Sequence, residues 1–107
     1  MNKIYVVLLF VVYIVISCLG LFMIKLAPSF KSAEFAGGFF LYGLGAALWM
    51  IILRQLPLSL AFPVAAGSLI IGTMLVGVFF LNEAVPLLHV FGAGAIIFGI
   101  YLIVSGA

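Results

Sequence analysis

Four long runs of uncharged and mostly apolar residues account for nearly all of this chain. The runs cover residues 4–24, 37–53, 58–81 and 85–107, and short segments that carry charge or proline separate them. A helix needs about 20 largely apolar residues to cross the hydrocarbon core of a bilayer. The pattern therefore predicts an all-α membrane protein with four transmembrane helices, placed at residues 4–24, 37–53, 58–81 and 87–105.

Composition agrees with lipid as the main solvent of the chain. Of the 107 residues, 69% are hydrophobic and 6% are charged, whereas about 25% of the residues of a soluble domain are charged. The connections at 26–36, 54–57 and 82–86 leave no room for a soluble domain. We expect residues 1–107 to form a single four-helix transmembrane domain, in a multi-pass protein of the inner cell membrane.

The segment Val15-Ile16-Ser17-Cys18 could be read as a lipoprotein processing site after a signal peptide. The apolar region of a signal peptide is about 7–15 residues long, but this run continues to Ile24. The longer run favours a helix that stays in the membrane, with Cys18 as a small buried residue. A lone cysteine forms neither an internal disulfide nor a metal site.

The basic residues do not decide the orientation of the chain. Four spans place Lys3 and Arg54 on one side of the membrane and Lys25 and Lys31 on the other, although orientation normally follows an excess of Lys and Arg on the cytoplasmic side. Two alternatives stay open. One is a weakly determined single orientation that a partner supports, and the other is insertion in both orientations, which would give an antiparallel dimer.

No Asp, Glu, Lys or Arg lies inside the four runs. Proton-coupled pumps usually keep an acid there, because a buried carboxylate can exchange protons and cations. The polar groups at depth are neutral and include Thr73. A substrate with hydroxyls would fit such a path, and the expected path residues are Tyr13, Ser17, Tyr42, Phe62 and Ser68. On this view Ser17→Leu would abolish transport and leave folding intact.

The ends of the runs offer few other sites. Lys25 and Arg54 either anchor their helices or contact a phosphate headgroup at the interface. Trp49, near the end of its run, is either an interfacial anchor or part of a substrate groove. His89 lies within a turn of the membrane boundary, so we expect it at headgroup level.

The fourth run carries small residues on one helical face. Gly92, Ala95 and Gly99 are three, four and seven residues apart, so they share a face of a helix. Small residues allow close approach of helices in lipid. They predict a packing face, either within the subunit or between two subunits.

Several function classes find no support in the sequence. It shows no metal-binding cluster, nucleophile–base pair or phosphate-binding glycine loop, and its one His has no acidic partner in its own run. We therefore expect no enzyme, no metal and no cofactor. No basic patch points to nucleic acid.

Three segments resemble one transporter family in order and spacing. They are Leu56-Pro57-Leu58-Ser59-Leu60-Ala61-Phe62-Pro63 at the start of the third run, Leu81-Asn82-Glu83 at its end, and residues 92–103 in the fourth. Together they resemble the small multidrug resistance transporters of the drug/metabolite transporter superfamily. The resemblance covers nearly the whole chain. It implies a four-helix bundle that works as a dimer, often an antiparallel one.

The chain departs from the drug exporters of that family at their site residues. Those exporters carry a Glu eight residues before a Lys in the first helix, and Ser17 stands eight residues before Lys25 here. They also carry a Tyr and, three residues later, a Trp, which correspond to Phe62 and Ala65. The subunits that flip undecaprenyl-phosphate-linked aminoarabinose also lack the acid and resemble this chain at the start of the third helix.

The resemblance thus implies a flippase subunit for a polyprenyl-phosphate-linked sugar or related lipid. Its partners would be membrane lipids and either a second copy of itself or a paralogous small subunit. Two alternatives stay open: an exporter of small cationic, drug-like or metabolite solutes, and a non-transporting accessory subunit of a larger membrane complex. A transporter would show a groove open to one leaflet, and an accessory subunit would show featureless helices with a face that needs another protein.

Overall fold

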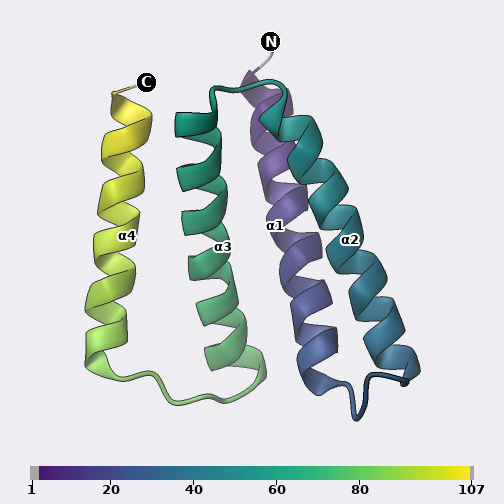
Figure 1. The fold of residues 1–107 in the computed structure, drawn as a ribbon. Helices are drawn as coiled ribbons and strands as arrows, with labels where there is room; N and C mark the ends of the chain where they lie inside the picture. The colour runs from purple at the N-terminus through teal and green to yellow at the C-terminus, as the bar shows by residue number, and fades with distance from the viewer. Residues whose placement is uncertain (1–2, 107) are drawn as a thin grey trace. The chain divides into compact units, whose positions relative to one another are not determined.

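The structure, a computed structural model, describes residues 3–106 and consists of four helices (Figure 1). They are α1 (Lys3–Leu26), α2 (Ala33–Leu53), α3 (Leu58–Phe80) and α4 (Leu87–Ser105). Each helix is long and apolar enough to cross a membrane. The predicted class, an all-α protein with four membrane-spanning helices, is therefore confirmed, and the chain is a multi-pass membrane protein.

The predicted helix ends agree closely with the observed ones except at the start of α2. This helix begins four residues before the predicted span, because Ser32 caps it. The backbone N–H of Phe35 donates a hydrogen bond to the Ser32 hydroxyl at 3.2 Å. Glu34 in the first turn suits the positive end of the helix dipole. The prediction had excluded Glu34 from the span because it is charged.

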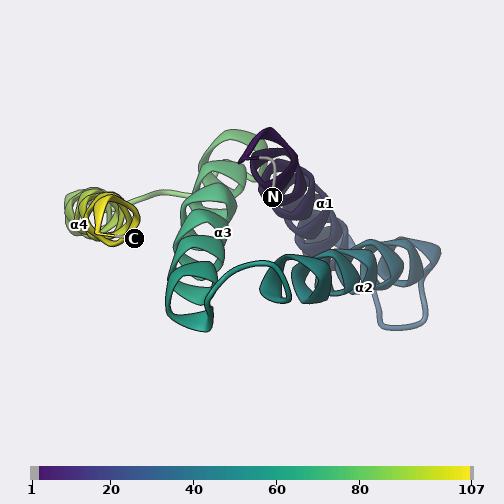
Figure 2. The ribbon, with the colours of Figure 1, turned by 90° about the horizontal axis from the view of Figure 1, so that it is seen from above.

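The chain folds as two helical hairpins that form separate compact units. The first contains α1 and α2 and ends at Gln55, and the second begins at Leu56 and contains α3 and α4. Each pair is antiparallel, and Figure 2 shows α1 and α2 inclined to each other. A single domain over residues 1–107 stays a prediction, and residues 1, 2 and 107 lie outside the described part.

The first hairpin is held by close approach of its two backbones. A Cβ atom added to Gly20 would lie 2.8 Å from the backbone nitrogen of Tyr42 and 2.9 Å from the carbonyl oxygen of Gly38. A Cβ atom added to Gly38 would lie 2.7 Å from the carbonyl oxygen of Gly20. Backbone atoms cannot turn aside as side chains do, so only glycine fits at these two positions. Close backbone contact at small residues is the usual basis of helix association in lipid.

The second hairpin uses one glycine and two large aliphatic side chains. A Cβ atom on Gly67 would lie 2.5 Å from Cδ1 of Ile100 and 3.3 Å from Cγ2 of Ile96. The two isoleucines of α4 therefore fill the space that the missing side chain leaves on α3. Helix α3 continues through Pro63, its sixth residue, which supplies no N–H for the helical bond to the carbonyl of Ser59 four residues earlier.

The end of α3 is a defined cap. Asn82 has a φ of 56°, in the left-handed region that Asn adopts more readily than most residues. The N–H of Glu83 donates to the carbonyl of Gly77 at 3.0 Å, and the N–H of Leu81 donates to the carbonyl of Val76 at 3.3 Å. These two bonds reach back six and five residues along the chain, further than the four residues of an α-helical bond, so the last turn of α3 widens before the chain turns at Asn82.

Candidate functional site

Polar and small residues meet along one seam between α1 and α2. The contacting positions are Tyr13, Ser17, Gly20 and Ile24 on α1, and Gly38, Tyr42, Gly45 and Trp49 on α2. On both helices the spacing is four, three and four residues, which is the spacing of a left-handed helix pair. Each large side chain faces a smaller group or another ring. Three of the five predicted path residues, Tyr13, Ser17 and Tyr42, therefore lie on one seam.

The centre of this seam is closed. Ser17 is 1% exposed, and its hydroxyl occupies the place where a Cβ atom on Gly45 would lie. The ring centroids of Tyr13 and Trp49 are 6.2 Å apart with an interplanar angle of 35°, within the range of favourable aromatic pairs. Trp49 thus has a packing partner in the hairpin. Tyr42 is 43% exposed, so its side chain extends beyond the seam.

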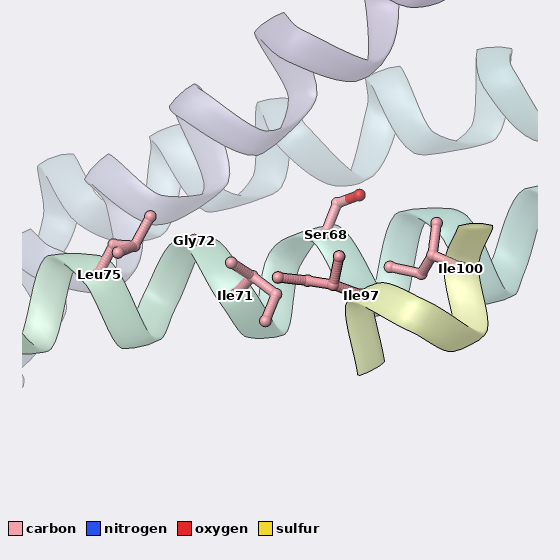
Figure 3. Close-up of a pocket in the computed structure, with 6 residues that line it drawn as sticks. All are labelled: Ser68, Ile71, Gly72, Leu75, Ile97 and Ile100. Atoms are coloured by element: carbon pink, nitrogen blue, oxygen red, sulfur yellow. The ribbon is translucent and has the colours of Figure 1, made fainter. Parts of the chain in front are cut away.

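The other two predicted path residues belong to the second hairpin. Phe62, in the first turns of α3, is 57% exposed. Ser68, near the middle of α3, is half-buried and lines a pocket between α3 and α4 (Figure 3). A common path through all five residues stays a prediction, because each hairpin is defined by itself.

The pocket between α3 and α4 has a volume of about 310 Å³. Its lining consists of Ser68, Ile71, Gly72, Leu75, Ile97 and Ile100. Figure 3 shows the isoleucines of the two helices gathered beside α3. Five of these six residues bring only hydrocarbon or backbone, and the hydroxyl of Ser68 is the polar side-chain group of the lining. We call this pocket the α3–α4 groove.

Thr73 follows Ser68 on α3, but its hydroxyl is already hydrogen-bonded within the helix. Its hydroxyl donates to the carbonyl of Leu69 and to that of Ile70, each at 2.9 Å. Such bonds satisfy a hydroxyl inside its own helix, which avoids the cost of an unpaired polar group in lipid. Thr73 is therefore accounted for by its own helix.

The four Lys and Arg residues all lie at or before Arg54. Lys25 stands in the last turn of α1 and Arg54 caps α2, and both are exposed. The sequence from Leu56 onward contains no Lys or Arg. Its acidic residue is Glu83, beyond the end of α3, and its His89 is exposed in the first turn of α4. Contact of Lys25 or Arg54 with a headgroup stays a prediction.

The predicted packing face of α4 is open within the chain. An added Cβ atom would meet nothing within 4 Å at Gly92 or at Gly99, and Ala95 is exposed. The contact between α3 and α4 uses Ile96 and Ile100 instead. A contact between subunits at this face stays a prediction.

Among the described residues, no group of three or more His, Cys, Asp or Glu side chains is placed to hold a metal ion.

Comparisons with known proteins find relatives that are named as flippase subunits. The chain is 43% identical over 60 residues to a protein of Yersinia pseudotuberculosis serotype O:1b (strain IP 31758) named as a probable 4-amino-4-deoxy-L-arabinose-phosphoundecaprenol flippase subunit ArnE, with 56% of this chain and 52% of that protein covered. A protein of the same name from Serratia proteamaculans (strain 568) is 39% identical over 62 residues, with 58% and 53% covered. The chain spans about half the length of the relatives it matches.

No family model matches the chain. No solved structure matches it either. The similarity to proteins named as flippase subunits agrees with the four apolar helices of a multi-pass inner-membrane protein.

Sequence reasoning missed the seam between α1 and α2. It found the small residues of α4 because three of them crowd into one short segment. The signal for the seam was present in the matched spacing of small and aromatic residues on the first two helices. That signal becomes visible only when the two helices are aligned in antiparallel register.

Proposed function

We propose that this chain is a subunit of a small transporter that moves a polyprenyl-phosphate-linked sugar, or a related lipid, from one leaflet of the inner membrane to the other. The observation that carries the proposal is the 39% to 43% identity to proteins named as flippase subunits for such a lipid. The match covers about half of each protein, so the substrate itself is part of the proposal.

The charge distribution supports a lipid substrate over a cationic one. Export of a cation coupled to protons relies on an acid inside the membrane, and the four apolar runs of this chain contain none. A lipid with a phosphate needs positive charge near the interface and little charge at depth. Lys25 and Arg54 at the ends of α1 and α2 supply such a positive charge for the headgroup.

Transport of this kind needs no coupling ion in the chain. If an enzyme on the far side consumes the lipid-linked sugar, the concentration difference between the leaflets drives net movement. The subunit then only has to lower the barrier that the sugar and the phosphate meet in the hydrocarbon core. Neutral hydroxyls along a path, as at Tyr13, Tyr42 and Ser68, reduce that barrier because they replace part of the hydration of the headgroup.

The functional unit in this proposal contains a second subunit, either another copy or a paralogue. None of the residues of α4 is buried within this chain, and the Gly92, Ala95 and Gly99 face has room for another helix. In this proposal the second subunit supplies the other wall of the path.

Reconstitution into vesicles tests the function. The chain is extracted with any subunit that stays bound and is placed in vesicles that contain an undecaprenyl-phosphate-linked aminosugar. An amine reagent that cannot cross the membrane then modifies only headgroups in the outer leaflet. We expect the modified fraction to rise beyond the outer-leaflet share when the protein is present. Modification limited to that share, as in protein-free vesicles, would refute the proposal, and uptake of a cationic dye instead would support the exporter alternative.

A further inference from the structure

The α3–α4 groove and the basic residues lie in different hairpins. The groove is built only from α3 and α4, whereas all four Lys and Arg residues precede Leu56. A lipid-linked sugar has two chemically different parts, an anionic phosphate with its sugar and a long uncharged tail. The second hairpin has no Lys or Arg to receive the phosphate.

The depth of the groove in the membrane also favours the lipid tail as its ligand. Ser68 and Ile97 lie near the middle of their helices, and a helix of this length just crosses the hydrocarbon core. From Ser68 to Leu75 the groove follows α3 for about 10 Å, at about 1.5 Å per residue. It therefore lies at the depth that the tail of a membrane lipid occupies, away from the headgroup region.

The lining matches an uncharged hydrocarbon chain. Ile71, Leu75, Ile97 and Ile100 supply aliphatic side chains, and Gly72 leaves one place without a side chain. Leu75 is 51% exposed and Ile97 is 55% exposed, so the groove opens to the surrounding lipid and a chain can enter from the side. The volume of about 310 Å³ is at the lower end of the range of ligand pockets, about 300–1,000 Å³. It holds a section of a chain and not a whole lipid.

We infer that the α3–α4 groove binds a section of the polyprenyl tail of the transported lipid, while the first hairpin receives the phosphate. This assignment rests on the proposed function, because the substrate's polyprenyl tail comes from that proposal. The groove holds the tail beside the protein while the headgroup crosses, so the tail and the headgroup are bound by different hairpins.

Photo-crosslinking tests the groove. The probes are undecaprenyl phosphate and the uncharged alcohol undecaprenol, each with a diazirine on the tail, and the comparison probe is a diacyl phospholipid with the same diazirine. After irradiation the labelled peptides are identified by mass spectrometry. We expect both polyprenyl probes to label residues 68–75 and 97–100 more than any other segment, and the phospholipid to label lipid-facing side chains without this preference.

Two groove variants and a matched control sharpen the result. Gly72→Leu adds a side chain at a glycine that lines the groove, and Leu75→Trp narrows the groove at a position that is already large and half exposed. The control is Gly94→Leu, which makes the same glycine-to-leucine change on α4. Nothing lies within 4 Å of a Cβ atom added at Gly94. We expect each groove variant to lower the labelling about tenfold, the change that about 1.4 kcal/mol of binding free energy produces. The control should label as the unmodified chain does.

The outcomes separate the groove from the function. Equal labelling of the groove by phospholipid and polyprenyl probes, or labelling that Gly72→Leu and Leu75→Trp leave unchanged, would overturn the assignment of the groove to the polyprenyl tail. Labelling confined to α1 and α2 would also overturn it. Failure of the vesicle assay together with specific labelling would refute the flippase and keep the groove as a polyprenyl site.

Discussion

The burial of Ser17, a predicted path residue, changes the expected effect of its substitution. Ser17 is 1% exposed, and its hydroxyl lies against Gly45 of the neighbouring helix. A leucine there would not fit between the two helices, so Ser17→Leu is expected to disturb the hairpin as well as transport. The earlier expectation that this variant folds normally does not agree with the packing.

Ser17→Ala is the sharper variant. It removes the hydroxyl and keeps the small volume, so we expect the helix content and the thermal unfolding of the detergent-solubilised protein to stay unchanged. If Ser17 lines the path, transport in the vesicle assay falls. Transport at the original rate, measured on protein with unchanged unfolding, would remove Ser17 from the path and leave it a packing role.

Among the residues that the structure describes, Asn82 is the one non-glycine residue with a positive φ. Asn82→Val is expected to cost about 1–3 kcal/mol of stability, because a β-branched side chain is strained in the left-handed region. Asn82→Gly should be close to neutral because glycine adopts this conformation freely. Thermal unfolding in detergent compares the two variants. Equal stability of the valine and glycine variants would show that the cap at the end of α3 does not depend on this conformation.

At the scale of elements, the seam between α1 and α2 determines the first hairpin. Gly45→Leu would drive a side chain into Ser17, and overpacking of this kind costs about 1–3 kcal/mol. Gly43→Leu is the matched control, because Gly43 lies on the same helix with nothing within 4 Å of an added Cβ atom. We expect a lower unfolding temperature for the first variant alone. A similar decrease of the unfolding temperature in both variants would mean that leucine destabilises α2 whether or not it lies in the seam.

The start of α2 depends on one side chain. The Ser32 hydroxyl accepts the N–H of Phe35, and loss of such a cap typically costs about 1 kcal/mol. Ser32→Ala should therefore increase hydrogen exchange at the first turn of α2, and Ser32→Asp should retain the original protection because Asp also caps helices. Unchanged exchange in the alanine variant would show that other groups hold this turn.

At the scale of the whole molecule, the open face of α4 determines which partners fit. If a second subunit packs on Gly92, Ala95 and Gly99, then Gly99→Leu should raise the dissociation constant of the dimer about tenfold, which corresponds to about 1.4 kcal/mol of binding free energy. Native mass spectrometry would show this as a lower dimer fraction. Gly94→Leu, on a different side of α4, should leave that fraction unchanged. A dimer that both variants retain equally would place the interface elsewhere, and a chain found only with a larger foreign protein would favour the accessory subunit.

The sequence by itself determined the four helices, because a run of about 20 uncharged residues has few stable structures in lipid other than a helix. It also determined that charge lies at the ends of the helices. Both ends of α3 and the start of α4 followed from proline and charge, while the start of α2 required the contact between Ser32 and Phe35.

Only the tertiary structure decided which small residues are contacts. Gly20 and Gly38 lie against the backbone of the neighbouring helix and Gly45 lies against the Ser17 side chain, whereas Gly92 and Gly99 are open, although all five look alike in the sequence. The same holds for the groove, whose lining residues on α3 and on α4 are more than 20 positions apart in the sequence. The physical reason is that packing in lipid depends on the register of two helices, and a single run of apolar residues carries no information on the register of its neighbour.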